Sequence, residues 1–293
     1  MIISNLLKQI LPPFIVTQYR FIRDTVMPPK DLSWGYFVPF TAWHEVQKSS
    51  TGYDDHSILE KVYEATQKVI RKEAAFERDS IAFPSMIYNW PLLACLGKIL
   101  SENNNSLNLL DFGGALGSSY YQNRPFFHPN AKIHWSIIEQ PSFVDKGKKY
   151  LETDELHFFH SLEEYLQNNT PSVLLFSSIL QYLETPYQSL NVLLQKTDPK
   201  YLIFDRTIFH QDPDKMDCVY LQKVPPDIYT SSYPIWFFSQ QQFINHLSGS
   251  YELLAEWDAL AGNVKVRSFK YPSRIINTGT DKGFLLKRKT NST

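Results

Sequence analysis

The stretch Leu109-Leu110-Asp111-Phe112-Gly113-Gly114-Ala115-Leu116-Gly117 decides the fold prediction for this chain of 293 residues. It has the pattern of a buried strand that ends in an acid and opens into a glycine-rich turn before a helix. Glycine adopts left-handed dihedrals and lets a ligand approach the backbone closely. In open α/β sheets, ligands bind at the carboxyl ends of such strands. The stretch therefore predicts a ligand site, with a glycine turn that binds nothing as the alternative.

Short apolar runs alternate with helical stretches after residue 105. Continuous apolar runs of this length fit strands that are buried on both faces of a parallel sheet. Helix starts are marked by Ser161 with Glu164, which form a capping box, and by Pro141 and Pro186 in first turns. We expect a doubly wound, Rossmann-like α/β sheet. Its expected strands are 107–110, 133–138, 156–159, 173–176 and 201–204.

Both ends of the chain depart from this alternation. Residues 251–257 and 283–287 have the pattern of two strands without a crossover helix, which predicts a terminal antiparallel pair. Helices are expected from Ser57 and over 91–100, and a polar run from Glu102 to Ser106 follows them. We place an N-terminal arm and helical lid at 1–105 and the Rossmann-like domain at 106–293.

Composition and net charge limit the classes of partner that the chain is expected to bind. A formal net charge of −1 provides no field that would draw the chain to nucleic acid. Two cysteines, Cys95 and Cys218, are too few for a metal cluster, so we expect no metal, reduced thiols and a cytoplasmic protein. No apolar run reaches the roughly 18 residues of a membrane span.

The first thirty residues are apolar in patches and carry Arg20, Arg23 and Lys30. One interpretation is a peripheral contact with an anionic membrane at its inner face. The other is an arm that packs on its own domain or on a partner subunit, which leaves an oligomer open.

The charges around the turn discriminate between ligands. Asp111 lies two residues before the first glycine, where an anion would repel a pyrophosphate but suit the ammonium of a methionine moiety. Dinucleotide sites use G-x-G-x-x-G with the pyrophosphate on a helix N-terminus. Glu139 follows the next strand and can accept hydrogen bonds from both ribose hydroxyls, a feature that NAD sites share. The pattern favours S-adenosylmethionine (SAM) and leaves an NAD-dependent nucleotide-sugar enzyme as an alternative.

The turn resembles the first motif of class I methyltransferases, with Ala115 where a middle glycine is usual. Over about residues 34–288, the chain is similar to an uncharacterised family of bacterial class I SAM-dependent methyltransferases, often associated with surface-polysaccharide biosynthesis. The matching stretches are GYDD (52–55), AAFERDS (74–80), LDFGGALGSSYYQNR (110–124), IEQPSFVDKG (138–147), LLFSSILQYLETPY (174–187), LIFDRT (202–207) and YTSSYPIWFFS (229–239).

The resemblance implies that the turn and the next strand end line a SAM site. The residues it implies are Asp111, Gly113, Gly117 and Glu139, to which we add their neighbours Gly114 and Gln140. Ser177, Ser178 and Gln181 lie at the end of the fourth strand and are candidates for the cofactor edge or the acceptor, although they can equally cap that strand and its following turn. A [DNS]-P-P-[YFW] motif, with which nucleic-acid amino-methyltransferases hold a planar amine, is absent there.

Candidate catalytic residues follow two other strands. Asp205 and Arg206 form an adjacent acid and base that can orient a hydroxyl or bind an acidic group, or form a structural ion pair. His160 and His210 are candidates for the general base that methyl transfer to oxygen needs, or are hydrogen-bonded loop residues.

Arg78, Tyr182 and Trp236 are the candidate acceptor-binding residues. Arg78 lies in Glu77-Arg78-Asp79, which we expect at the solvated end of the first long helix; its match to the family stretch suggests a lid residue. Trp236 belongs to an expected aromatic loop over 220–238 that roofs an acceptor or packs in the core. Residues 265–289 contain one acid, Asp281, among eight basic residues, a pattern of a protected strand edge or of attraction to a phosphorylated acceptor.

These patterns predict a SAM-dependent methyltransferase. Its expected acceptor is an oxygen or nitrogen atom of a small molecule or glycan intermediate, the glycan part resting on the resemblance alone. The alternatives are the NAD-dependent enzyme and a binding module that keeps the methyltransferase fold without turnover.

Overall fold

The computed structural model describes residues 32–38, 40, 42–52, 56–226, 228 and 230–290. The arm with Arg20, Arg23 and Lys30 lies outside these residues, and so does the predicted membrane or subunit contact. Within the described part, no helix has the length and apolar character needed to span a membrane.

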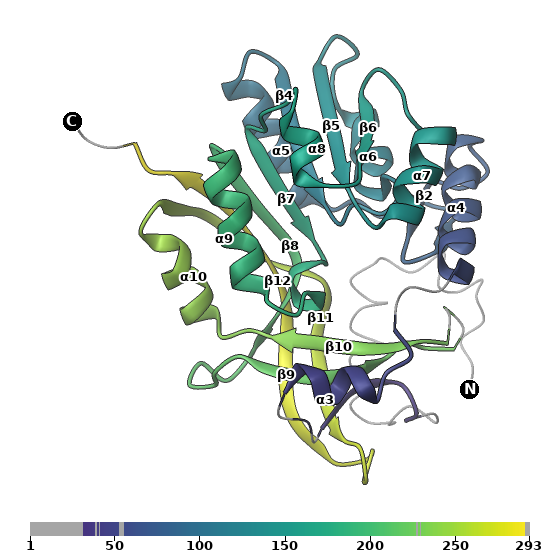
Figure 1. The fold of residues 1–293 in the computed structure, drawn as a ribbon, viewed down its shortest axis with the longest axis vertical. Helices are drawn as coiled ribbons and strands as arrows, with labels where there is room; N and C mark the ends of the chain where they lie inside the picture. The colour runs from purple at the N-terminus through teal and green to yellow at the C-terminus, as the bar shows by residue number, and fades with distance from the viewer. Residues whose placement is uncertain are drawn as a thin grey trace.

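The parallel half of a ten-stranded sheet occupies the upper part of Figure 1. Its strands run in the order β8-β7-β4-β5-β6, and every neighbouring pair is parallel. Their bounds are β4 (Ser106–Phe112), β5 (Lys132–Ile138), β6 (Leu156–Phe159), β7 (Val173–Ser177) and β8 (Tyr201–His210). The winding reverses between β4 and β7, so the glycine turn after β4 lies at the switch point where ligands bind. The expected doubly wound sheet is confirmed.

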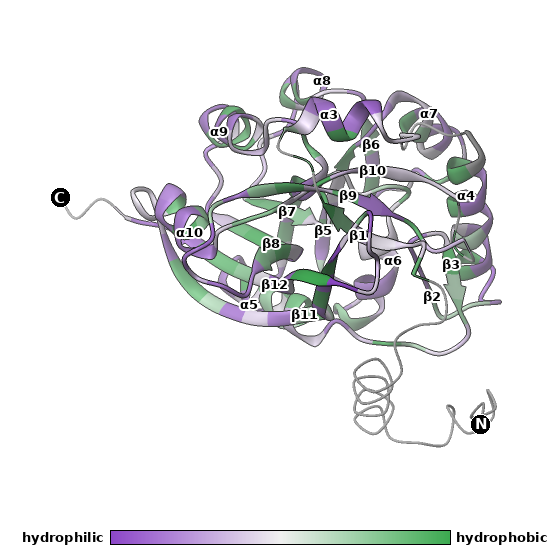
Figure 2. Ribbon diagram, turned by 90° about the horizontal axis from the view of Figure 1, so that it is seen from below, coloured by the Kyte–Doolittle hydropathy of each residue, from purple (hydrophilic) through white to green (hydrophobic). Residues whose placement is uncertain are grey.

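Two helical layers cover this half and explain its continuous apolar runs. Leu109 belongs to the core on one face and the adjacent Leu110 to the core on the other, and both are fully buried. Figure 2 shows the hydrophobic strands between the layers. One layer comprises α4 (His56–Ile70), α5 (Trp90–Glu102), α6 (Ser118–Asn123) and α7 (Pro141–Tyr150). The other comprises α8 (Leu162–Leu166), α9 (Pro186–Thr197) and α10 (Gln240–Ser248).

The antiparallel half continues the sheet in the lower part of Figure 1, in the order β10-β9-β1-β11-β12-β8. Its strands are β1 (Gly35–Val38), β9 (Cys218–Lys223), β10 (Ser232–Phe237), β11 (Tyr251–Ser268) and β12 (Ile275–Arg288). Neighbouring strands are antiparallel except β1 and β11, which pair in parallel. The predicted terminal pair is confirmed as β11 and β12, which are longer than expected. Tyr36 of β1 pairs with Gln222 and Val266, so the segment before residue 105 contributes a strand to the same sheet.

Two local predictions were wrong. The expected aromatic loop contains β9 and β10, because its side chains alternate between two cores: Leu221 packs near α3 (Trp43–Lys48) and Tyr220 packs with Phe237. Glu77-Arg78-Asp79 is not a helix end, since α4 stops at Ile70. It belongs to a hairpin of β2 (Phe76–Arg78) and β3 (Ile81–Phe83), which the stacked rings of Phe76 and Phe83 hold together.

A β-bulge shapes β8 beside the predicted ligand site. Phe204 pairs with Phe284 and Thr207 with Lys282, so Asp205 and Arg206 together oppose the single residue Gly283. Arg206 adopts a left-handed φ of 53°. Bulges occur near active sites, where they redirect a side chain. The strand therefore continues past the end expected at Phe204, and the bulge presents Arg206 at the carboxyl edge of the parallel half.

Glycine at position 283 lets a tryptophan ring lie over this bulge. A Cβ there would lie 2.1 Å from Cε2 of Trp257, its cross-strand partner. We expect Gly283→Ala to lower the free energy of unfolding by roughly 1–3 kcal/mol, because the ring has to move. Urea unfolding measures the effect. Gly249→Ala is the matched control, since its Cβ meets nothing within 4 Å and its backbone is already helical. Equal stability of both variants would contradict this account of the bulge.

Candidate functional site

A cavity of about 280 Å³ opens at the carboxyl ends of β4, β5, β7 and β8. This is the lower end of the range for small-molecule sites, about 300–1,000 Å³. It brings together most of the residues that the sequence predicted. Those that line it are Arg78, Asp111, Gly113, Gly114, Glu139, Gln140, Ser177, Ser178, Tyr182 and Arg206. Gly117 ends the same turn as the N-cap of α6.

Asp111 lies directly beneath the glycine turn. The side chain is fully buried, and Nε1 of Trp135 donates to its Oδ2 at 3.1 Å. A Cβ on Gly114 would lie 2.6 Å from Cγ of Asp111, so only glycine allows this approach. Burial raises the pKa of Asp111 to about 7, and Oδ1 has no hydrogen-bond partner among the described residues. A buried polar atom of this kind needs a partner such as a ligand donor.

Glu139 holds the other side of the turn. Its Oε1 accepts from the backbone N–H of Gln140 at 2.8 Å, and its Oε2 accepts from that of Ala115 at 3.2 Å. Burial raises the pKa of this carboxyl group above its ordinary value. Each carboxylate oxygen can accept a further hydrogen bond. The two bonds therefore orient the Glu139 side chain and leave its oxygens able to accept further hydrogen bonds.

The N–H groups of the turn are largely engaged within the protein. Gly113 donates to the carbonyl of Ile138 at 2.9 Å, Gly117 donates to that of Gly114 at 3.0 Å, and Ala115 donates to Glu139. A phosphate site needs such groups free and aimed at the ligand. The turn is thus suited to a neutral or cationic ligand group rather than to a pyrophosphate.

Glu77 is a site residue that the sequence analysis did not select. It is 5 % exposed on β2, lines the cavity and accepts hydrogen bonds from the hydroxyl of Ser118 and, at 3.0 Å, from the N–H of Ser80. Burial raises its pKa to about 7. The family resemblance of residues 74–80 could have indicated Glu77, but it suggested a role for Arg78 alone.

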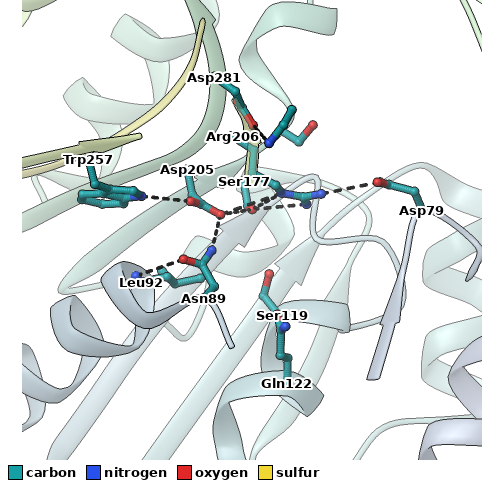
Figure 3. A network of polar contacts seen from close by, with 12 residues as sticks. Asp79, Asn89, Leu92, Ser119, Gln122, Ser177, Asp205, Arg206, Trp257 and Asp281 are labelled. Carbon is teal, nitrogen blue, oxygen red and sulfur yellow. Dashed lines mark hydrogen bonds and ion pairs between the residues drawn. The ribbon is translucent and has the colours of Figure 1, made fainter. Parts of the chain in front are cut away.

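Asp205 joins three elements in the network of Figure 3. Its Oδ2 accepts from Nδ2 of Asn89 at 2.8 Å and from the hydroxyl of Ser177 at 3.2 Å, and its Oδ1 accepts from Nε1 of Trp257 at 3.4 Å. Asn89 also caps α5 by accepting from the N–H of Leu92. Asp205 is 1 % exposed and both of its oxygens are engaged, so its geometry is that of a positioning residue.

The two arginines of the site have different partners. Arg206 lies 3.6 Å from Asp79 and 3.8 Å from Asp205, measured between nitrogen and oxygen. Arg78 packs its guanidinium 5.6 Å and 5.5 Å from the ring centres of Phe76 and Phe83, and its Nη1 has no hydrogen-bond partner in the described structure. Burial and the charge of Arg206 lower the pKa of Arg78.

Three predicted residues lie away from the cavity. His160 is partly exposed and contacts Asp145, with 2.8 Å between Nε2 and Oδ1. His210 lies 2.8 Å from Asn277, and burial lowers its pKa to about 4. Trp236 stacks on Trp43 and donates to a backbone carbonyl. Within the described residues, no group of three or more histidines, cysteines or acids could hold a metal ion.

Comparisons with known proteins give structural similarity alone. No family model matches the chain, and no curated protein matches it. The N-terminal domain of EvdMO1, solved in the presence of SAH and D-fucose, is 13 % identical over 81 % of this chain and 98 % of its own, with a TM-score of 0.45. A SAM-dependent methyltransferase from Clostridium acetobutylicum ATCC 824 is 12 % identical over 78 % and 98 %, with a TM-score of 0.41.

A third solved structure is the Burkholderia thailandensis 1,6-didemethyltoxoflavin-N1-methyltransferase, which is 10 % identical over 89 % of this chain and 98 % of its own, with a TM-score of 0.40. Identities and TM-scores this low carry nothing about the residues of a site. The function of this chain has to follow from its own geometry.

Asp111 makes the stability of the protein depend on pH. Its pKa is raised from 3.8 to about 7 on folding, so its contribution is fully present below pH 3.8 and is lost as the pH rises through 7. We expect Asp111→Asn to gain roughly 2–4 kcal/mol of unfolding free energy, relative to the parent, between pH 5 and pH 8. Urea unfolding across that range measures the gain.

Asp154→Asn is the control for this measurement, because Asp154 is an exposed carboxyl. The gain of Asp111→Asn should rise more steeply with pH than any difference between this control and the parent. An Asp111→Asn curve parallel to that of the parent would contradict a buried carboxyl with a raised pKa.

Proposed function

We propose that this chain is a SAM-dependent methyltransferase that transfers a methyl group to an oxygen or nitrogen atom of a small-molecule acceptor. The observation that carries the proposal is the pair of carboxyl groups, fully buried Asp111 and partly buried Glu139, on either side of a glycine turn at the switch point of the sheet. When bound, SAM supplies an electrophilic methyl group on a sulfonium and leaves as a neutral thioether.

The residues present fit this cofactor. Oδ1 of Asp111 lacks a partner in the described structure, and an ammonium group would provide one. Glu139 is fixed by two backbone bonds and retains lone pairs for the two ribose hydroxyls. Four acids line the cavity, against two arginines, and this excess of acids favours a cationic ligand over an anionic one. The acids are Glu77, Asp79, Asp111 and Glu139, and the arginines are Arg78 and Arg206.

The same features count against the NAD-dependent alternative. A pyrophosphate would meet the carboxyl of Asp111 and would find the N–H groups of Gly113, Ala115 and Gly117 already engaged. The binding-module alternative predicts the same cofactor affinity, so detection of a methylated product is what separates it from an enzyme.

In this proposal, most of the catalytic effect comes from positioning. Asp205 holds Ser177 and lies beside Arg206, which forms part of the cavity wall. His160 contacts Asp145 and Glu164 instead of lining the cavity, so we assign it no role in proton transfer. The glycan-intermediate acceptor and the cytoplasmic location expected from the sequence stay part of the proposal.

Calorimetric titration with S-adenosylhomocysteine and SAM tests the site. We expect micromolar binding, and Glu139→Gln should weaken it at least tenfold, about 1.4 kcal/mol, because the amide is a poorer acceptor for the ribose hydroxyls. Glu163→Gln on α8 is the matched control, since Glu163 is exposed and pairs with Lys196. NAD should give no heat of binding. Folded protein that binds NAD, or that binds neither SAM nor its product, would contradict the proposal.

A further inference from the structure

A second cavity, of about 270 Å³, adjoins the first. The two share Arg78, Asp79, Ser178, Tyr182, Arg206 and Tyr233. Most of the remaining lining comes from the antiparallel half, including Tyr36 of β1, Gln222 of β9 and Asp281 of β12, and Gln181 contributes from the turn after β7. Because Asp111 and Glu139 line only the first cavity, the two compartments have different chemistry and meet at Arg78 and Arg206.

Buried polar atoms without partners gather on these cavities. In the described part of the chain, nine buried side-chain nitrogen or oxygen atoms lack a hydrogen-bond partner, and five belong to residues that line one of the two cavities. These five residues are Arg78, Ser80, Asp111, Gln181 and Asp281. Native proteins satisfy nearly all buried polar groups, so such a concentration indicates missing ligand contacts.

The second cavity offers one donor and two acceptors of this kind. The donor is Nη1 of Arg78, and the acceptors are Oε1 of Gln181 and Oδ1 of Asp281. A ligand that satisfies all three has to carry both a hydrogen-bond acceptor and hydrogen-bond donors.

The charge distribution specifies the acceptor group of the ligand. Arg206 has Asp79 and Asp205 within ion-pair distance, whereas no ion pair to Arg78 is formed in the described structure. Burial and then the charge of Arg206 lower the pKa of Arg78, and the nearby acids Asp79, Asp205 and Glu77 oppose this only in part. An anionic group next to Arg78 would relieve both effects through charge-assisted hydrogen bonds.

Asp281 indicates which hydrogen-bond donor the ligand carries. Its Oδ2 accepts from the N–H of Ala261 at 3.0 Å, and the side chain is 2 % exposed. Burial raises its pKa to about 7; Arg206 opposes the rise, while Asp205 and Asp79 add to it. A carboxyl group that titrates near neutral pH is suited to accept a proton from a hydroxyl group.

We propose that the second cavity is the acceptor site and takes a small hydroxylated compound that carries a carboxylate or phosphate group. Arg78 binds the anionic group, and the hydroxyl groups donate to Asp281 and Gln181. This inference rests on the proposed methyl transfer and specifies its substrate class. In the reaction, the acceptor oxygen forms a bond to the methyl carbon while the carbon–sulfur bond breaks, and the hydroxyl proton passes to ionised Asp281.

Three related probes test the inference: uncharged glycerol, D-glycerate, in which a carboxylate replaces one CH2OH group of glycerol, and glycerol 3-phosphate, in which one hydroxyl group is esterified with phosphate. Each is titrated into protein saturated with S-adenosylhomocysteine, with binding followed by nuclear magnetic resonance. At least one charged probe should bind tenfold or more tightly than glycerol, and the comparison of the two identifies carboxylate or phosphate as the preferred group. Arg78→Met should abolish the preference, measured at a concentration of S-adenosylhomocysteine that saturates the variant.

Arg71→Met is the matched control, because Arg71 is exposed and pairs with Glu73 outside both cavities. Arg78→Lys keeps the positive charge and should retain part of the preference, which keeps the test valid if the methionine variant folds poorly. Equal binding of all three probes to the parent protein, or an unchanged preference in folded Arg78→Met, would overturn the inference.

A different experimental result would contradict the cofactor proposal. If S-adenosylhomocysteine does not bind, the proposed methyl transfer is contradicted, and so is the inference that rests on it. If S-adenosylhomocysteine binds and no probe preference depends on Arg78, the cofactor site stands and the acceptor assignment alone is wrong.

Discussion

The carboxylate of Asp205 connects three elements that build the candidate site. It accepts hydrogen bonds from Asn89 at the start of α5, from Ser177 at the end of β7 and from Trp257 on β11. Because the group is buried, loss of its partners would leave an uncompensated charge in the interior. The helical N-terminal segment, the parallel half and the antiparallel half are therefore fixed relative to one another at the cavity wall.

The bulge that carries Asp205 also divides the interior into two compartments. Arg206, the second bulge residue, lines both cavities, and Arg78 reaches the same junction from the β2–β3 hairpin. On one side lie the acids Asp111 and Glu139, and on the other lies Asp281. This division gives the proposed cofactor and the proposed acceptor separate surroundings, with the place for methyl transfer between them.

Features that depend on residues close together in the chain could be predicted from the sequence. The glycine turn and the acids at the ends of β4 and β5 depend on near neighbours, and they appear where expected. Asp281 and Tyr36 were not selected, because β12 and β1 reach the second cavity only through long-range pairing. The bulge escaped prediction for the same reason, since Gly283 defines it from about 80 residues away.

The central claim is that the acid-lined cavity after β4 and β5 binds the adenosyl cofactor. A crystal structure of the protein with S-adenosylhomocysteine tests it most directly. The account predicts both ribose hydroxyls on Glu139, the amino group beside Asp111 and the sulfur facing the junction with the second cavity. A ligand bound elsewhere, or one in this cavity whose ribose makes no contact with Glu139, would contradict it.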